Sequence, residues 1–197
     1  MKFVGLEKVK DGKYLKNYEL TYINKFGREK KYEIVSRKEL KEVSDLGKQP
    51  SGVSIIATID NKLLLLHEFR MGVNKKIYNL CAGMIEKEET IEECIARELF
   101  EETGLKLKKI KHILPPSYAA VAITDTTTYI AFVEAEDDTT DHSAFFEDHS
   151  SENEDIEAGL YTKDEVRKLL ETEEFSSRAQ MAAFYFAYSS NEGGFTL

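Results

Sequence analysis

Hydrophobic and polar residues alternate in short runs over the first quarter of the chain, a pattern typical of strands with one buried face. Two of these runs, residues 17–23 and 31–37, flank residues 24–28, which are rich in turn-forming types. The pattern therefore predicts a β-hairpin near the N-terminal end of the sequence.

Two more hydrophobic runs follow at residues 53–59 and 63–70, separated only by an Asp-Asn pair. They predict a second pair of strands. A polar connector precedes them. We therefore expect residues 1–50 to form a small β appendage and residues 51–197 to form the main domain.

A four-residue repeat of apolar positions predicts a helix from Thr90 to Gly104. Thr90 and Glu93 have the spacing of a capping box, and Gly104 is placed to end the helix in left-handed geometry. The apolar repeat consists of Ile91, Ile95 and Leu99.

The remaining pattern predicts strands at residues 129–133, after a Pro-Pro break at 115–116, and at residues 156–161. A second capping box opens a helix at Thr162. The last helix, residues 177–188, is apolar almost all round, so we expect it to be buried. This order of elements predicts an α/β (α+β) fold in which helices cover a mixed sheet.

Composition narrows the class of protein. Hydrophobic residues make up 42% of the chain, which is enough for a folded core. No apolar run approaches the ~20 residues of a membrane span, and the first residues do not resemble a signal peptide, so we expect a cytoplasmic protein that is not bound to a membrane. Cys81 and Cys94 lack metal-site or disulfide spacing and are expected to be packing residues.

The net charge of 27 − 36 = −9 is unevenly distributed. Residues 112–162 contain twelve carboxylates and no Lys or Arg, so this segment carries −12 and the rest carries +3. Such a segment cannot bind nucleic-acid phosphates directly, but it could hold divalent cations or be a solvated acidic loop. His142 and His149 lie in it without the spacing of metal ligands, and we expect them to be solvated.

Three carboxylates crowd one side of the predicted helix, because Glu98 and Glu102 are four residues apart and Glu101 lies beside them. Arg97 can pair with Glu101 and with Glu93, but it does not obviously neutralise the other two. A hard cation such as Mg²⁺ or Mn²⁺ would do so. A charged stripe facing solvent is the alternative.

The spacing around these carboxylates favours the cation. Five residues separate Gly83 from Glu89, and seven more lead to the run Arg97-Glu98-Leu99-Phe100-Glu101-Glu102-Thr103-Gly104-Leu105. Seven fixed identities at this spacing have a chance probability on the order of 10⁻⁸ per starting position. The chain thus resembles Nudix hydrolases, and this resemblance implies an α/β/α sandwich around a mixed sheet.

The resemblance also implies an activity and a set of roles. The family cleaves nucleoside diphosphates linked to another moiety, by attack of a metal-activated water on phosphorus. It implies metal ligation by Glu98, Glu102 and the carbonyl of Ala82, with Glu101 as a further ligand or catalytic helper. The supporting roles fall to Arg97, which orients the glutamates, and to Gly83, Glu89 and Gly104, which shape the loop and helix.

Features outside this motif resemble the ADP-ribose pyrophosphatase branch, also called the ADP-sugar branch. In that branch an N-terminal β appendage helps to form a homodimer. By the same resemblance Arg70 contacts substrate phosphates, Glu152 is the first choice for the general base, and Glu154 is a metal ligand or the substitute base. The implied partner is a small nucleoside diphosphate sugar, with no nucleic acid and no membrane.

Several positions depart from the branch or leave alternatives open. The chain has no glycine in the Pro-Pro-Ser-Tyr segment at 115–118, where the branch has a Ser-Pro-Gly-like turn, and the loops at 38–51 and 137–151 look long. A GDP-sugar or a dinucleotide therefore remains an alternative substrate, and a non-catalytic nucleotide-sugar sensor an alternative function. His67 is expected to be a packing residue. The appendage tyrosines suit a half-buried sheet, a dimer interface or stacking on adenine; they are Tyr18, Tyr22 and Tyr32.

Overall fold

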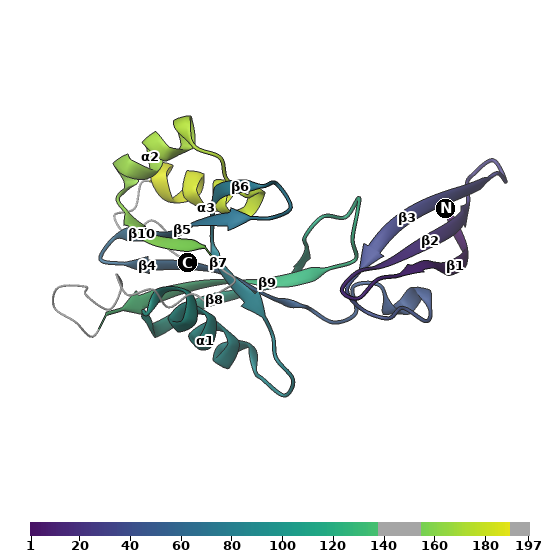
Figure 1. The fold of residues 1–197 in the computed structure, drawn as a ribbon, viewed down its shortest axis with the longest axis horizontal. Coiled ribbons are helices and arrows are strands. Elements are labelled where there is room, and N and C mark those ends of the chain that lie inside the picture. Colours follow the sequence, from purple (N-terminus) through teal and green to yellow (C-terminus); the bar gives the residue numbers. More distant parts are fainter. Residues whose placement is uncertain (138–154, 190–197) are drawn as a thin grey trace. The chain divides into compact units, whose positions relative to one another are not determined.

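The structure is a computed structural model, and it describes residues 1–137 and 155–189. The chain divides into two compact units (Figure 1). The first unit combines Met1–Ser51 with Pro116–Thr128, and the second combines Gly52–Pro115 with Tyr129–Leu197. No helix in the described ranges has the length and apolar character needed to cross a membrane.

The first unit contains an antiparallel sheet of strands β1 (Lys2–Asp11), β2 (Lys16–Ile23) and β3 (Glu29–Ser36), in that spatial order. The predicted hairpin is confirmed as β2 and β3. Its turn is held by the side chain of Asn24, which accepts hydrogen bonds from the backbone N–H groups of Phe26 and Arg28. Strand β1 was not predicted, because its lysines and glycine interrupt the alternation.

The core of this unit is built around Tyr18, which is fully buried, and its hydroxyl accepts a hydrogen bond from the Leu40 N–H at 2.9 Å. The connector after β3 carries a short 3₁₀ turn, η1 (Val43–Asp45). Residues 116–128 complete the unit, since the Ile123 carbonyl accepts a hydrogen bond from the Val35 N–H at 2.8 Å. A distant segment of sequence therefore protects the edge of β3.

The second unit is built on a mixed sheet whose strand order is β10-β5-β4-β9-β8, with β6 paired to β5 and β7 paired to β4. The predicted turn between β4 and β5 is confirmed, since Asp60 and Asn61 both have positive φ (47° and 60°). The strands are β4 (Gly52–Ile59), β5 (Lys62–Arg70), β6 (Lys75–Asn79), β7 (Cys81–Met84), β8 (Lys106–Tyr118), β9 (Thr127–Glu136) and β10 (Ile156–Tyr161).

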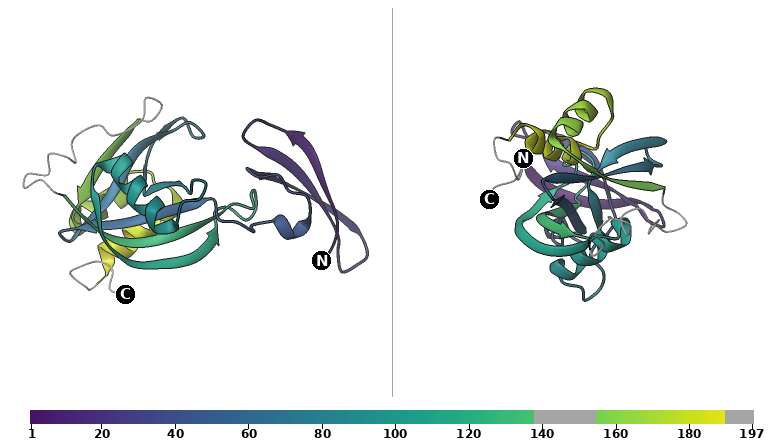
Figure 2. Two further views of the ribbon diagram at one scale, coloured as in Figure 1. Left: turned by 90° about the horizontal axis from the view of Figure 1, so that it is seen from below. Right: turned by 90° about the vertical axis from the view of Figure 1, so that its left-hand side faces the viewer.

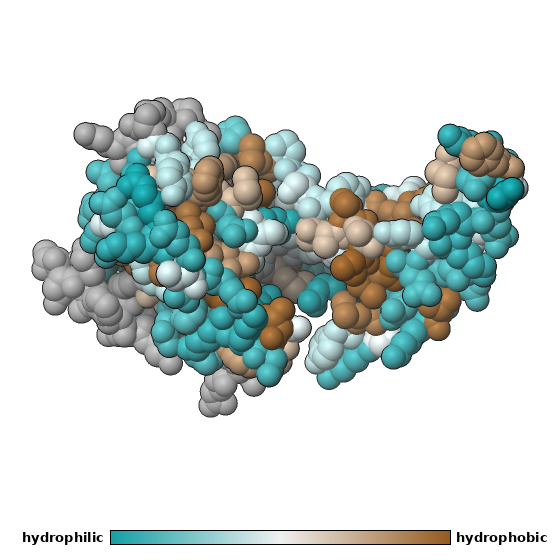
Figure 3. All heavy atoms as spheres, turned by 90° about the horizontal axis from the view of Figure 1, so that it is seen from above, coloured by the Kyte–Doolittle hydropathy of each residue, from teal (hydrophilic) through white to brown (hydrophobic). Residues whose placement is uncertain are grey.

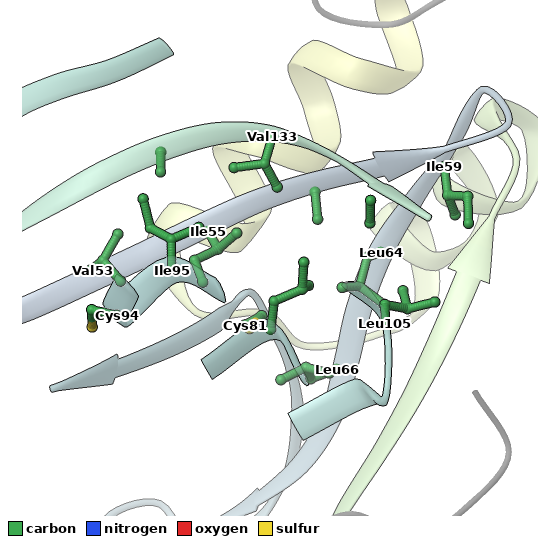
Figure 4. Close-up of a cluster of buried hydrophobic side chains, with 14 residues drawn as sticks. Val53, Ile55, Ile59, Leu64, Leu66, Cys81, Cys94, Ile95, Leu105 and Val133 are labelled. Carbon is green, nitrogen blue, oxygen red and sulfur yellow. The ribbon is translucent and has the colours of Figure 1, made fainter. Parts of the chain in front are cut away.

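Helices cover both faces of this sheet (Figures 1 and 2). Helix α1 (Ile91–Thr103) packs on one face, where the odd-numbered residues of β4 and the buried thiols of Cys81 and Cys94 form one core cluster (Figure 4). Helices α2 (Lys163–Thr172) and α3 (Ser177–Tyr188) pack on the other face. The expected α/β/α sandwich and the packing role of the cysteines are confirmed.

Helix α1 begins and ends where the sequence predicts. The Thr90 hydroxyl accepts a hydrogen bond from the Glu93 N–H, and the Glu93 carboxylate accepts one from the Thr90 N–H, which completes the capping box. Gly104 has a φ of 71°, and its N–H donates to the Phe100 carbonyl. These caps set the position of the helix at both ends.

The predicted break at Pro115 and Pro116 is wrong, because β8 runs through both prolines from Lys106 to Tyr118. Strand β8 lies at the end of the strand order and has one neighbour, β9. Proline lacks a backbone N–H, but an edge strand tolerates it because no donor is needed on its outer side. The segment therefore continues out of the second unit and into the first.

The expectation that α3 is buried holds for one face of the helix only. Its buried face is mainly alanine, which allows close packing on the sheet, whereas larger side chains point to solvent. The buried residues are Ala179, Ala182, Ala183, Phe186 and Ala187, and the exposed ones include Met181, Phe184, Tyr185 and Tyr188. Composition alone did not distinguish the two faces.

Candidate active site

Two of the three crowded carboxylates of α1, Glu98 and Glu102, do not belong to a stripe that faces solvent. Glu98 is buried, with an exposed fraction of 9%, and it lies against the backbone of β7 at Gly83. A Cβ atom at Gly83 would lie 1.7 Å from the Glu98 carboxyl carbon. Glycine is therefore required at this position for Glu98 to occupy its site.

Glu102, one turn further along α1, also points at β7. Its carboxylate accepts a hydrogen bond from the Ala82 N–H at 3.0 Å and one from the Cys81 thiol. Burial raises the pKa of Glu102 to about 8, since these two hydrogen bonds offset only part of the cost of desolvating the charge. Burial likewise raises the pKa of Glu98. Two adjacent carboxylates are thus held where a cation would favour their ionised forms.

Arg97 is the centre of an ion-pair network. Its guanidinium donates to both oxygens of Glu89 at 2.8 and 3.0 Å, to Glu98 at 2.8 Å and to Glu101 at 3.0 Å. It also donates to the Met84 carbonyl at 3.0 Å. The planar fork of arginine suits this arrangement, which fixes the helix carboxylates relative to the loop after β7.

The same network holds that loop. Glu89 accepts a hydrogen bond from the Glu86 N–H at 2.8 Å, and Arg97 beside it lowers the pKa of Glu89 to about 2. Glu88 adopts a left-handed conformation with a φ of 68°. Glu93, which we expected beside Arg97, instead serves the capping box with Thr90. This geometry fits the supporting role expected of Glu89.

A pocket of about 330 Å³ lies beside these residues. Arg70 at the end of β5, Ala82 of β7 and Glu102 of α1 all line it, so three residues singled out for different roles meet in one place. The other lining residues are Glu68, Phe69, Met71, Gly72, Asp155 and Ile156.

The donor set around β7 suits a hard divalent cation, because Glu98, Glu102 and the Ala82 carbonyl are all oxygen ligands. The space at Gly83 that a Cβ would fill admits the Glu98 carboxylate, which supports this fit. In the described ranges no three acidic, histidine or cysteine side chains are grouped closely enough to hold a metal as they stand.

The other residues singled out from the sequence differ in their exposure, and some of them lie outside the described residues. The Glu101 side chain is 56% exposed and pairs only with Arg97 among the ion pairs of the described residues. His67 is half-buried and stacks on Tyr78 with ring centroids 4.7 Å apart, as expected of a packing residue. Glu152, Glu154, His142 and His149 lie outside the described residues.

Sequence analysis missed Glu68. This residue has an exposed fraction of 6%, lines the pocket and contacts Arg70. A signal was present, because Glu68 falls two residues after Leu66 on the core-facing side of a hydrophobic strand. A carboxylate at such a position requires a buried partner.

Comparison with known proteins gives a family match. A family model described as "NUDIX domain" matches residues 48–184. The chain is 31% identical over 91 residues to an ADP-ribose pyrophosphatase of Bacillus subtilis, covering 46% of this chain and 49% of that protein. It is 44% identical over 43 residues to an NAD-capped RNA hydrolase NudC of Photobacterium profundum, covering 22% of this chain and 16% of that protein. The chain thus spans about half of the first relative and less of the second.

A solved structure has a similar fold over nearly the whole chain. It is described as an ADP compounds hydrolase, and the comparison covers 93% of this chain and 90% of that one, with a TM-score of 0.68. Sequence identity is 19%, so this likeness concerns the fold.

Proposed function

Because the chain belongs to the NUDIX family, we propose that it hydrolyses the pyrophosphate bond of ADP-ribose or of a related nucleoside diphosphate sugar. The products are AMP, or another nucleoside monophosphate, and a sugar phosphate. The similarity to an ADP-ribose pyrophosphatase of Bacillus subtilis supports this substrate class.

The observation that carries the proposal is the pocket lined by Arg70, Ala82 and Glu102. A cationic side chain and a carboxylate of the two-glutamate cluster on α1 both line this pocket. Hydrolysis of a pyrophosphate needs positive charge to neutralise the phosphates before water attacks phosphorus, and in this proposal Arg70 and a cation held by the glutamates would supply it. Arg70 binds a phosphate oxygen in this scheme, and its fork of donors matches that geometry.

Divalent cations are typical of this family, and Mg²⁺ or Mn²⁺ is the proposed cofactor. Glu98, Glu102 and the Ala82 carbonyl would hold it, with Glu101 as a further ligand or helper. The cation supplies positive charge that stabilises the phosphates and lowers the pKa of the attacking water. Arg97 and Glu89 orient the glutamates through the hydrogen bonds described above.

The proposed general base follows from sequence resemblance. Glu152 accepts the proton of the attacking water, and Glu154 is a cation ligand or takes this role in its place. Substitution of Glu152 by glutamine should lower kcat by orders of magnitude. If kcat is unchanged, the base is a different residue, with Glu154 the next to test.

The decisive experiment is an assay of the purified protein with Mg²⁺ against ADP-ribose, GDP-sugars and dinucleotides such as NAD⁺, with chromatographic identification of the products. The proposal expects ADP-ribose or another ADP-sugar to have the highest kcat/KM. Preference for NAD⁺ would favour the second candidate, a dinucleotide hydrolase, which the local similarity to NudC supports. Preference for a GDP-sugar would change the proposed substrate but not the proposed reaction, which is hydrolysis of a pyrophosphate bond.

Glutamine variants of the helix carboxylates separate an enzyme from a sensor. Glu98→Gln and Glu102→Gln keep side-chain size but remove charge, and a hydrolase should lose turnover by several orders of magnitude. A nucleotide-sugar sensor would have no Mg²⁺-dependent turnover to lose.

We further propose that the protein is cytoplasmic. We also propose that residues 1–50, the N-terminal part of the first unit, contribute to a homodimer. Hydrophobic residues reach the surface of the first unit (Figure 3), which supports the homodimer. The exposed side chains of this unit include Val4, Val9, Leu15 and Phe26. Sedimentation equilibrium of the full chain tests the homodimer. A monomer at micromolar concentration would contradict it.

A further inference from the structure

We propose that Glu68, Asn79 and Ser176 form a relay that positions Arg70 for substrate phosphates, so that the N-terminus of α3 helps to set substrate affinity. This inference rests on the proposed role of Arg70 in the hydrolase. It assigns a function to a buried polar chain that the catalytic residues do not include.

The relay begins at Glu68. Its side chain is 8% exposed, whereas that of Arg70 is 56% exposed, and Arg70 Nη1 donates to Glu68 Oε2 at 3.2 Å. Residues two apart on a strand share a face, so both side chains extend toward the pocket from the same side of β5. A buried carboxylate therefore anchors an arginine that lines the pocket and has further N–H donors besides the one bound to Glu68.

Asn79 at the end of β6 holds the other oxygen of Glu68, because its amide nitrogen donates to Glu68 Oε1 at 2.5 Å. The orientation of this amide is set in turn by Ser176, whose hydroxyl donates to the Asn79 side-chain oxygen at 2.5 Å. The two hydrogen bonds use opposite ends of one amide. Rotating the amide by 180° would break both.

Ser176 is itself fixed to the sheet. It is the N-cap of α3 and accepts a hydrogen bond from the Ala179 N–H. Its own N–H donates to the Tyr78 carbonyl at 2.9 Å, and the Tyr78 N–H donates to the Glu174 carbonyl at 2.8 Å. The relay thus connects a rigid helix terminus to a side chain at the mouth of the pocket.

Charge also favours a positioning role. Glu68 and Glu102 both line the pocket, so it already contains two carboxylates. A buried charge is costly unless it is paired and hydrogen-bonded. Glu68 is paired with Arg70 and accepts a hydrogen bond from Asn79. The alternative is that Glu68 is a further cation ligand, and the experiment below is designed to separate the two roles.

The test is a double-mutant cycle on hydrolysis of ADP-ribose by the full-length protein, with Glu68→Gln, Arg70→Ala and the double variant. Glu68→Gln keeps the size of the side chain and removes its charge. We expect it to raise KM about tenfold while kcat changes less than about twofold, because loss of one charge-assisted hydrogen bond loosens Arg70. In the Arg70→Ala background the same substitution should leave KM unchanged.

Two further variants sharpen the cycle. Asn79→Ala should raise KM in the wild-type background and have no effect when Arg70 is absent. Glu174→Gln is the matched control, and the KM of this variant should equal that of the wild type. The Glu174 side chain lies just before α3 and forms an exposed ion pair with Lys75 of β6.

Equal effects of Glu68→Gln in both backgrounds would overturn the inference, and so would a rise in the Mg²⁺ requirement with KM for ADP-ribose unchanged. If the wild-type protein hydrolyses none of the nucleotides tested, the proposed function fails. The cycle is then measured on affinity for inorganic pyrophosphate by calorimetry. Coupling between Glu68 and Arg70 there would still support the relay, whereas additivity or absence of binding would refute it.

Discussion

At the scale of single residues, the candidate site depends on how two glutamates on α1 approach the backbone of β7. Glu98 occupies space that is available only because residue 83 has no side chain, and the half-buried Glu102 accepts hydrogen bonds from Ala82 and Cys81. Both contacts are tight, so small substitutions in this region should have large effects on activity.

Gly83→Ala should reduce turnover about 100-fold, since the added methyl group forces Glu98 out of place and misplacement of about 1 Å can cost that much. The measurement is kcat with ADP-ribose and Mg²⁺, together with circular dichroism to show that the fold is retained. Gly5→Ala is the control, because its Cβ would meet Thr21 at an ordinary contact distance of 3.6 Å. Retention of full activity by Gly83→Ala would contradict the packing described here.

The raised pKa of Glu102 predicts a pH dependence of stability in the absence of metal. The pKa of a glutamate in the unfolded chain is about 4.5 and that of Glu102 in the folded protein is about 8, so between these values the folded protein retains a proton that the unfolded chain has lost. Stability should therefore fall as pH rises from about 5 to 8. The free energy of unfolding, measured in urea with a chelator present, should fall over this pH range in the wild type. The fall should be smaller in Glu102→Gln. Parallel pH profiles for the two proteins would refute the assignment.

At the scale of elements, α1 is positioned by its two caps and by the Arg97 network rather than by apolar packing alone. Both caps are local features of the sequence. The orientation of the carboxylates toward β7 follows once the helix begins at Ile91 and ends at Thr103, because residues 98 and 102 then share one face.

Removal of the N-cap by Thr90→Ala should destabilise the protein by about 1 kcal/mol, because it leaves helix N–H groups without an acceptor. Gly104→Ala should have a similar cost of about 1 kcal/mol, since its φ of 71° is unfavourable for residues with a Cβ. Both are measured by urea unfolding. Glu92→Gln is the control and should change stability by less than about 0.5 kcal/mol, being an exposed residue outside the capping box.

At the scale of the whole molecule, the two units share the β8–β9 hairpin. Its end at residues 116–128 belongs to the first unit, where the Tyr32 hydroxyl donates to the Ala122 carbonyl at 2.7 Å and the Ser51 N–H donates to the Thr127 carbonyl at 2.8 Å. The first unit is therefore built from two separate stretches of chain.

This sharing predicts that a fragment of residues 1–51 does not fold by itself, because the edge of β3 then lacks its partner and the core is very small. Amide NMR spectra of the fragment should show poor dispersion, which should improve when residues 116–128 are joined to it by a flexible linker. A well-dispersed spectrum of the fragment alone would contradict the prediction.

The sequence by itself determined features that depend on neighbouring residues. The turn at Asp60 and Asn61, the capping boxes and the spacing of the helix glutamates were all predicted, because backbone propensity and side-chain spacing act over a few residues. The motif from Gly83 to Gly104 likewise indicated a phosphate chemistry before any tertiary contact was known.

Only the tertiary structure decided features that depend on distant partners. Strand β8 continues through two prolines because it lies at a sheet edge, and α3 buries only the face that meets the sheet. Glu68 is tolerated inside because Asn79 reaches it from the neighbouring strand β6, in addition to the local partner Arg70 on β5. The energy of a buried charge or an edge strand is set by what surrounds it in space, and residues distant in sequence supply those surroundings.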